Sequence, residues 1–489
     1  MKRPWLLRLT VLAGAALVIA IAAALLLNSP GAQRRPAGGF DDMIARNAER
    51  MLDEGQSIFR YDTFGDESFW GGQLRLHDAI AGAANGGVGP GVSPRQALAL
   101  GLKVDSDALP ADIRQAIVQG RVNLDDPATT LTLLRLNAVV GVTGFFNGDR
   151  MASIGIQCAL CHSTVTNDLQ GMPGIGRRLD GWANQDLNVG AIIASAPDLT
   201  PLSRLLGVDV QGVRNVLLSW GPGKFDAQLI LDGRAFQPDG RSSATLIPPA
   251  FGLAGQNLHT STGFGAVPYW NAFVAGLEMH GHGMYWDPRL GDPNQFPVAA
   301  RAGFARVEGD PDLITSKLPA LQFYQLAIPA PRPSAGTFDR AAADRGEMLF
   351  NGRARCGECH VDPLYSEPGY DIHTPQDIGI DGFQASRSPA HGYRTTPLAG
   401  IWTHTQRGFF HDGRFPTLID VVDHFDSQLS LGLSDRDKQD VVQYMLSLPR
   451  PAEPLVYTRI APPSQIAPAG QRTQPSYGFQ RPTRGRRSK

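Results

Sequence analysis

Two short stretches decide the fold of this chain: Cys158-Ala159-Leu160-Cys161-His162 and Cys356-Gly357-Glu358-Cys359-His360. Both have the pattern C-x-x-C-H, and together they hold every cysteine of the chain, so none remains for a structural disulfide. A four-cysteine zinc site would need the two pairs about 15–20 residues apart, far closer than they are here. A redox-active C-x-x-C pair does not require the histidine that follows each pair.

The pattern C-x-x-C-H is typical of covalent haem attachment. Two thiols three residues apart can add to the two vinyl groups of one haem, and the adjacent histidine then supplies an imidazole ligand to the iron. The sequence therefore predicts two covalently bound haem c groups, with His162 and His360 as the proximal iron ligands.

The sixth position of each iron separates electron transfer from catalysis, because an open position can bind O₂ or peroxide. After His360 the only methionine is Met445, which falls in the apolar stripe of a predicted helix and is interpreted as a core residue. His411 lies between aromatic residues and a turn, so we expect it to be the second ligand; a surface histidine is the alternative interpretation. The other histidines of this region are His373, His391, His404 and His424.

No histidine follows the first motif until His259, so the candidate distal groups for the first haem are Met172 and the residues of segment 278–286. The glycine-rich segment 278–286 contains His280, His282 and Met284, and its glycines permit close approach of the backbone. Any of the three could ligate the iron, or a histidine here could bond a propionate or a carbonyl. The residues predicted to act in catalysis are His280, His282 and Trp270.

Arg177 and Arg178 come soon after the first motif. Arginine recognises carboxylates bidentately, so both are candidate partners of the haem propionates. A plain surface role is the alternative for each.

Periodicity and punctuation predict a mainly α, loop-rich fold with two c-type cytochrome domains packed around the haems. Helices are expected over 41–60, 94–101 and 107–119, with a glycine-rich loop at 82–94, and no long alternating strand pattern is found. Two further helices are expected over 338–350 and 434–448. The predicted divisions are a membrane segment 1–33, an N-terminal extension 34–130, a first haem domain 131–335, a second haem domain 336–450 and a disordered basic tail 451–489.

The N-terminal segment Leu9–Leu27 is uncharged and follows Lys2, Arg3 and Arg8. At about 1.5 Å per residue it nearly spans a bilayer core of about 30 Å. An uncleaved anchor is favoured over a cleaved signal peptide, because no good small-residue cleavage site follows. Either form exports the body, which we expect on the periplasmic side of a bacterial inner membrane, anchored by one pass, or secreted after cleavage.

Charge is distributed unevenly along the chain. Residues 1–36 carry five Lys or Arg and no acid, and residues 450–489 carry eight Lys or Arg against Glu453 alone. The remaining body is acidic by 13 charges, which argues against a nucleic-acid-binding function. We interpret the basic tail as solvated; contact with a membrane or an acidic partner is the alternative.

The chain resembles the di-haem cytochrome c peroxidases and MauG-type proteins, and within them the di-haem rubber oxygenases of the RoxA type. The resemblance covers roughly residues 130–450. Beyond the two widely spaced motifs, it is carried by Arg345-Gly346-Glu347, Thr396-Pro397-Leu398-Ala399-Gly400-Ile401-Trp402, Phe410-His411-Asp412-Gly413 and Pro416-Thr417-Leu418.

The resemblance implies two packed haem domains, with an electron-transfer second haem and a reactive first haem. It implies that His411 is the distal ligand of the second haem and that Trp270 lines a first-haem pocket open to O₂. The chain departs from that pattern at His280, His282 and Met284, because a ligand there would close the first iron.

Two functions are therefore expected. One is a haem enzyme that reduces peroxide or oxygenates an organic substrate at the first haem, with electrons supplied through the second. The other is a pure electron-transfer cytochrome with both irons six-coordinate. The expected partners are a redox protein, the membrane through the N-terminal helix, and a small-molecule oxidant or organic substrate, with no nucleic acid.

Overall fold

The computed structural model describes residues 39–450 except 168, 170 and 171. The predicted membrane segment 1–33 and basic tail 451–489 lie outside these residues. Within the described part, no helix is both long enough and apolar enough to cross a membrane. The described residues before Arg450 belong to one compact unit, and the predicted division between residues 335 and 336 stays a prediction.

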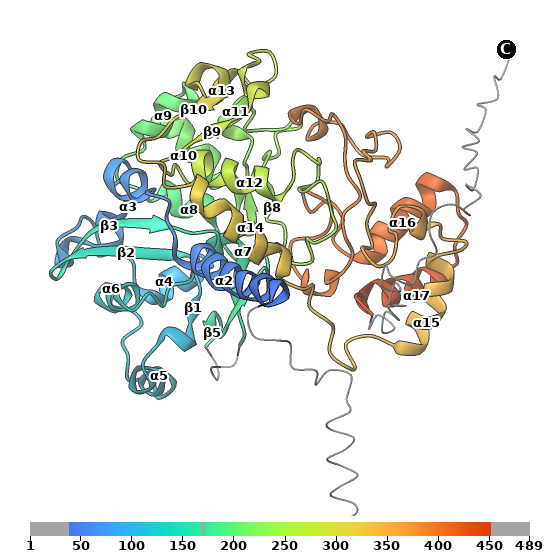
Figure 1. The fold of residues 1–489 in the computed structure, drawn as a ribbon, viewed down its shortest axis with the longest axis horizontal. Helices are drawn as coiled ribbons and strands as arrows, with labels where there is room; N and C mark the ends of the chain where they lie inside the picture. Colours follow the sequence, from blue (N-terminus) through green and yellow to red (C-terminus); the bar gives the residue numbers. More distant parts are fainter. Residues whose placement is uncertain (1–38, 168, 170–171, 451–489) are drawn as a thin grey trace, which may run out of the picture. The chain divides into compact units, whose positions relative to one another are not determined.

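The described part is mainly helical and rich in loops, as predicted (Figure 1). Its strands are arranged in two-stranded pairs and build no larger sheet within residues 39–450. The pairs are β1 (Val104–Asp105) with β5 (Ile175–Gly176), β2 (Val142–Asn147) with β3 (Arg150–Ile156), β4 (Ser163–Val165) with β6 (Arg178–Asp180), β7 (Lys224–Phe225) with β8 (Thr245–Leu246), and β9 (Tyr285–Trp286) with β10 (Arg306–Val307).

The helix predicted over 41–60 is α2 (Phe40–Tyr61), and it packs along α14 (Leu318–Ala327), as Figure 1 shows. The two helices approach closely because Gly55 has no side chain: a Cβ there would collide with the carbonyl oxygen of Ala320. Phe59 is fully buried on the same face of α2.

The two short helices predicted next also form. Ser93 caps α4 (Pro94–Ala99) in a capping box with Gln96, and α5 (Ala111–Val118) follows. The predicted loop between 82 and 94 contains only one short 3₁₀ turn, Ala83–Asn85.

The other α-helices before residue 330 are α3 (Leu76–Ala81), α6 (Pro127–Arg135), α7 (Ala159–His162), α8 (Val189–Ala194), α9 (Thr200–Leu206), α10 (Val210–Trp220), α11 (Leu229–Asp232), α12 (Val267–Phe273) and α13 (Pro297–Ala302). Two π-helical segments, η1 (Ser68–Gln73) and η4 (Val274–Glu278), lie among them.

The hairpin β2–β3 is the main departure from the sequence prediction, which found no strand pattern here. Gly148 and Asp149 form its turn, and Gly148 has a φ of 59°, a conformation that favours glycine. A register shift between Phe145 and Phe146 breaks the two-residue alternation, which explains why periodicity did not reveal the strands.

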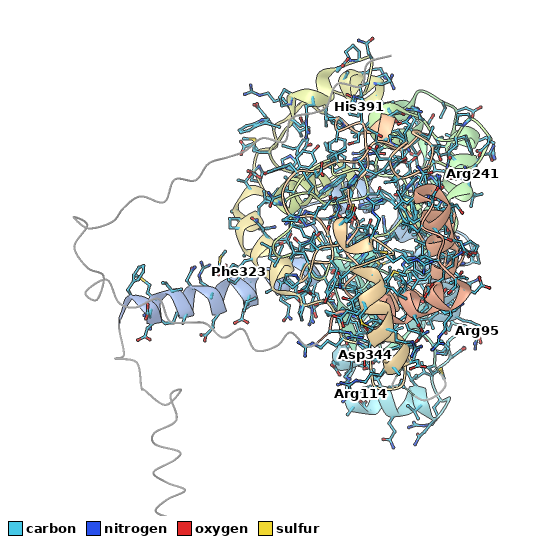
Figure 2. The ribbon with its side chains drawn as sticks, turned by 90° about the vertical axis from the view of Figure 1, so that its right-hand side faces the viewer. Arg95, Arg114, Arg241, Phe323, Asp344 and His391 are labelled. Atoms are coloured by element: carbon cyan, nitrogen blue, oxygen red, sulfur yellow. The ribbon has the colours of Figure 1, made fainter. Side chains whose placement is uncertain are left out.

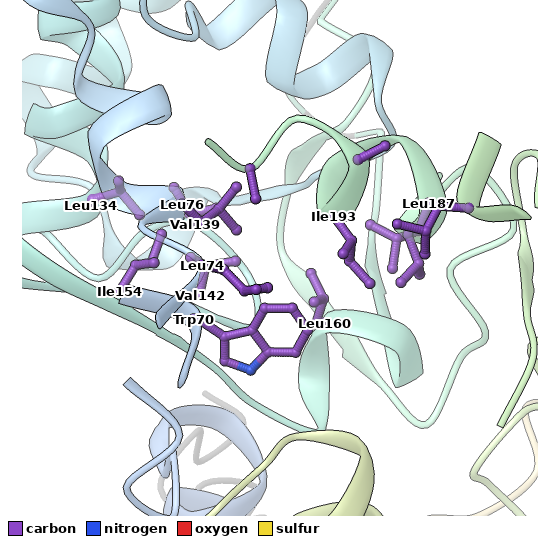
Figure 3. Packing of buried hydrophobic residues seen from close by; sticks show 14 of the residues in the cluster. Trp70, Leu74, Leu76, Leu134, Val139, Val142, Ile154, Leu160, Leu187 and Ile193 are labelled. Carbon is purple, nitrogen blue, oxygen red and sulfur yellow. The ribbon is translucent and has the colours of Figure 1, made fainter. Parts of the chain in front are cut away.

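The largest hydrophobic cluster connects this hairpin with the first C-x-x-C-H motif. Figure 3 shows Leu160, the second variable residue of the motif, beside Trp70, and the same cluster contains Leu74 and Ile154. Burial of each large apolar side chain stabilises the fold by about 1.5–3 kcal/mol, so this cluster anchors the motif in the core.

The two helices predicted in the C-terminal region form as α15 (Arg340–Phe350) and α17 (Asp435–Leu446), and a further helix that was not predicted, α16 (Leu418–Leu429), precedes α17. Ser434 caps α17 through the predicted capping box with Asp437. Helices α15 and α17 cross at Gly346, where a Cβ would collide with the Asp440 carbonyl oxygen. The side chain of Met445 is buried in the cluster beneath this crossing, which agrees with its interpretation as a core residue.

A fully buried arginine joins the C-terminal region to the preceding one. Arg387 lies at the end of a 3₁₀ turn, and its guanidinium contacts Asp232 at 2.7 Å and Asp226 at 3.0 Å. Both carboxylates are also buried. Burial raises the pKa of Asp226 to about 6, although the Arg387 charge opposes that shift. Since an isolated buried charge is costly, the three side chains depend on one another.

Candidate haem sites

The first C-x-x-C-H motif is held from both of its ends. Strand β3 leads into Cys158, and the fully buried Asp66 accepts a hydrogen bond from the Ile156 amide just before it. On the far side, the Asn184 amide donates to the Cys161 carbonyl oxygen at 2.9 Å. The motif itself forms the short helix α7, which brings the two thiols to one side.

The ring of His162 is oriented for iron ligation through Nε2. Its Nδ1 lies 3.0 Å from the carbonyl oxygen of Pro248. Because a carbonyl oxygen can only accept, Nδ1 must carry the proton and Nε2 keeps its lone pair. A backbone carbonyl on the second ring nitrogen is the arrangement that commonly fixes metal-ligating histidines. Burial also lowers the pKa of His162, which keeps the ring neutral.

The second motif repeats this arrangement with different elements. Helix α15 delivers the chain to a 3₁₀ turn, Cys356–Glu358, and Nδ1 of His360 lies 3.0 Å from the carbonyl oxygen of Tyr365. The ring of His360 packs at 6.2 Å from that of Phe350, at the end of α15. Both histidines therefore meet the requirement for a proximal haem ligand.

The cysteines do not resemble a redox pair. All four are free thiols, although each pair is only three residues apart in sequence. A reactive thiol needs a lowered pKa, whereas burial raises the pKa of Cys158, Cys161 and Cys356 to about 12. Buried, unpaired thiols beside a correctly oriented histidine fit two haem c groups, in which they would be thioethers.

Arg178 has the properties of a propionate partner for the first haem. It lies on β6, which pairs with β4 directly after His162. Its Nε donates to Asp105 at 3.1 Å, while both terminal nitrogens are buried and have no hydrogen-bond partner among the described residues. The two terminal nitrogens leave buried donors for a further acceptor, and a propionate would supply one. The side chain of Arg177 is exposed, so the two predicted candidates are not equivalent.

We expect Arg178→Met to lower the reduction potential of the first haem. The substitution removes a positive charge that favours the reduced state and leaves the buried Asp105 without its partner; both effects act in the same direction. A potentiometric titration of the two haems measures this change. Arg177→Met is the matched variant and should leave both potentials where they are; equal shifts in the two variants would refute the assignment.

Arg394, which the sequence did not single out, is a candidate propionate partner in the second haem region, as Arg178 is in the first. The guanidinium of Arg394 is buried, donates to the carbonyl of Thr260 and to Gln256, and forms no ion pair with a carboxylate within residues 39–450. Burial lowers its pKa to about 10. Beside it, the buried ring of His259 has both nitrogens unpartnered in the described part of the chain. This pair fits a propionate of the second haem.

Glu278 was also missed, because a lone glutamate in a sequence is usually a solvated residue. It ends the π-helix η4, and its Oε1 is buried and unpartnered among the described residues. Burial raises its pKa well above the ordinary value, with a further contribution from Asp226. Its charge in turn acts on the thiol of Cys161, so Glu278 lies within electrostatic range of the first haem attachment point. Helical π segments are frequent at functional sites.

The three predicted catalytic residues occupy different surroundings. Trp270 lies on α12, which runs directly into η4, and its buried indole nitrogen has no partner within the described residues. His280 stacks on Phe69 at 3.6 Å and has a φ of 59°, a strained conformation for a histidine. The side chain of His282 is exposed and its Nδ1 bonds the carbonyl of Pro311. Their catalytic roles stay predictions.

His411 differs from the other histidines of its region. His373, His404 and His424 each use Nε2 to bond an oxygen atom, and His391 is exposed at the surface (Figure 2). Neither ring nitrogen of His411 has a hydrogen bond to any described residue, and burial lowers its pKa to about 4. A neutral ring with free nitrogens is what an iron ligand requires.

Several contacts hold the segment around His411 in place, as an iron ligand requires. Its ring stacks on Tyr393 at 5.2 Å, and Tyr393 exchanges backbone hydrogen bonds with His373. Phe410 has a φ of 66°, so the turn that presents His411 is strained. The predicted role of His411 as iron ligand stays a prediction.

An aromatic contact joins the two haem regions. Trp182, which follows β6, packs edge-on against Trp402 with ring centroids 5.5 Å apart, and Phe251 lies 6.5 Å from Trp182. Trp402 belongs to the segment 396–402 on which the family resemblance partly rests.

No family model matches the chain. A curated protein, cytochrome-c peroxidase IdrP1 of Pseudomonas sp. (strain SCT), is 25% identical over 179 residues, which cover 25% of this chain and 44% of that protein. The chain thus matches less than half the length of this relative. Among solved structures, a MauG-like protein associated with microbial copper homeostasis shows 17% identity and a TM-score of 0.28, over 44% of this chain and 76% of that one. Kuenenia stuttgartiensis hydrazine synthase shows 19% identity and a TM-score of 0.24, over 44% and 75%.

The match to the peroxidase supports the coarse prediction of a redox haem protein related to the cytochrome c peroxidases. The finer resemblance to the rubber oxygenases stays a prediction.

Proposed function

We propose that this protein is a di-haem c-type cytochrome that reduces peroxide, or activates O₂, at the first haem and receives electrons through the second. The observation that carries the proposal is Glu278, a buried carboxyl group whose Oε1 has no partner among the described residues and which lies within electrostatic range of Cys161. A pure electron carrier has no use for such a group, since burying it without a partner costs stability. The peroxidase name of the sequence relative points in the same direction.

Bound haem would supply the iron that takes up the oxidant. The chain would supply the rest: His162 as the proximal ligand, held by Pro248, and Glu278 as the acid–base group. Because burial raises its pKa, Glu278 keeps its proton to a higher pH than an exposed glutamate does, and in that form it could give a proton to an oxidant. Activity should therefore decline as the pH rises through that raised pKa.

Glu278→Gln should lower peroxide turnover by about 10²–10⁴-fold, the usual contribution of a positioned acid–base group. The change is isosteric and leaves both haem motifs intact, so covalent haem content should match the wild type. Steady-state peroxide reduction with an artificial electron donor measures the effect. Glu308→Gln, at an exposed position, is the matched control. Equal turnover in the two variants would remove Glu278 from the mechanism.

In the second region, we propose that His360 and His411 both ligate the iron, which closes it to oxidants. The Trp182–Trp402 contact offers a route for electrons toward the first haem. The donor would be a separate redox protein.

A pure electron-transfer cytochrome is the second candidate, and one observation favours it. His280 is buried, its pKa is lowered to about 4, and its backbone is in a strained conformation; the other candidate ligands, His282 and Met284, follow closely in the chain. A ligand from this segment would close the first iron. Carbon monoxide distinguishes the candidates, because only a protein with an open ferrous haem binds it.

We also propose that the protein is exported, with Leu9–Leu27 as a single-pass anchor, or as a signal peptide if it is cleaved. Covalent haem attachment outside the cytoplasm accords with this location, and the uncharged segment after Lys2, Arg3 and Arg8 supports it.

A further inference from the structure

The proximal histidine of the first haem and the candidate distal ligand of the second are bonded to the same short piece of backbone. Nδ1 of His162 donates to the carbonyl oxygen of Pro248 at 3.0 Å. Two residues earlier, the amide of Leu246 donates to the carbonyl oxygen of His411 at 2.7 Å. Only Ile247 lies between the two anchoring residues.

This piece of backbone is rigid. Leu246 belongs to β8, which pairs with β7, and the amide of the buried Ile247 donates to Gly223 at 2.9 Å. Pro248 and Pro249 follow, and their rings fix φ and confine the preceding residue to extended conformations. A shift of the Leu246 amide should therefore also move the Pro248 carbonyl.

Additional contacts hold each end. On the first-haem side, the amide of Ala250 donates to Gly181, whose own amide donates to the carbonyl oxygen of His162. On the second-haem side, Nζ of Lys224, the partner of Leu246 across the strand pair, donates to the carbonyl oxygen of Asp412 at 2.7 Å. Each histidine thus has one direct hydrogen bond to the segment, and neighbouring residues add an indirect connection.

We infer that Leu246–Pro248 is a positioning strap that sets the ligand geometry of both haems together. This inference rests on the proposed function, because it takes His162 and His411 as iron ligands. A displacement of His411 is passed through Leu246 to the Pro248 carbonyl, which fixes the orientation and basicity of the His162 ring. The ligand field of the first iron then depends on an interaction made in the second haem region.

Leu246→Pro tests the strap, because proline has no amide hydrogen and the bond to His411 is lost while the strand conformation is tolerated. Leu246→Ala is the matched control: it removes the side chain and keeps the amide. The readout is the electron paramagnetic resonance spectrum of the ferric protein, with covalent haem counted in each sample. We expect the g-values of both haems to shift in Leu246→Pro and to match the wild type in Leu246→Ala.

A second variant covers the case in which Leu246→Pro does not fold. Pro248→Gly loosens the strap and keeps every backbone donor, so both haem signals should broaden. Changes confined to the second haem, in whichever of the two variants folds, would overturn the strap and leave the proposed function standing. A wild-type protein that carries fewer than two covalent haems would overturn both.

Discussion

His411→Ala is expected to convert the second haem from low spin to high spin. Among the described histidines after His360, His411 has a buried, neutral ring whose nitrogens make no hydrogen bond to the described residues. Met445 is not available as a ligand, because its side chain is buried in the hydrophobic cluster at the α15–α17 crossing. Among the other histidines after His360, the ring nitrogens of His373, His404 and His424 are engaged in hydrogen bonds, and His391 is exposed. The electron paramagnetic resonance spectrum should lose its low-spin signal almost completely, and the altered haem should gain the ability to bind carbon monoxide.

The matched control is His391→Asn. His391 is exposed and has a φ of 53°, a conformation that asparagine tolerates better than alanine (Figure 2). This variant removes a histidine from the same region and should keep the wild-type spectrum. A low-spin signal that survives His411→Ala would refute the ligand assignment. It would bring His259 forward as the alternative, since neither of its ring nitrogens has a hydrogen-bond partner among the described residues.

Arg387→Met is expected to be the most destabilising single change outside the haem motifs. It leaves Asp226 and Asp232 buried without their cation, and loss of one partner of a buried ion pair costs about 3–5 kcal/mol. Because the three side chains join the C-terminal region to the rest, we also expect weaker coupling between the two parts. Denaturant unfolding followed by circular dichroism measures the loss.

The exposed pair Arg95–Asp125 provides the control for Arg387. Arg95→Met breaks a contact of similar length at the surface, where water and salt screen it, so no measurable change is expected. The double variant Asp226→Asn with Asp232→Asn, made in the Arg387→Met background, should recover part of the lost stability. An Arg387→Met protein as stable as Arg95→Met would show that the network contributes nothing to the fold.

The parts that were predictable from sequence are those in which local pattern and tertiary structure agree. The C-x-x-C-H motifs define their own chemistry, and α2 and α17 show clear periodicity or a capping box at positions that the structure confirms. The hairpin β2–β3 was not predicted, because its register shift breaks the alternation of the strands. Asn147-Gly148 is a turn signal that could have revealed it.

The site residues that the sequence did not predict were missed for a different reason. Glu278 and His259 have buried polar atoms with no hydrogen-bond partner among the described residues, and Arg394 is a buried cation that hydrogen-bonds only neutral groups there. Burial of this kind depends on the packing of segments far apart in sequence. Arg178 and Arg177 are adjacent in sequence, and only the strand pairing of β6 distinguishes the buried side chain from the exposed one. The strap between His162 and His411 likewise has no sequence signal, since it is made of backbone bonds.

The electron paramagnetic resonance spectrum of the ferric wild-type protein, integrated against its covalent haem content, tests the central claim most directly. The proposed function predicts two covalent haems per chain, one high-spin at His162 and one low-spin at His360 and His411, in equal amounts. Two low-spin haems would contradict an open first site, and a chain without covalent haem would contradict the assignment altogether.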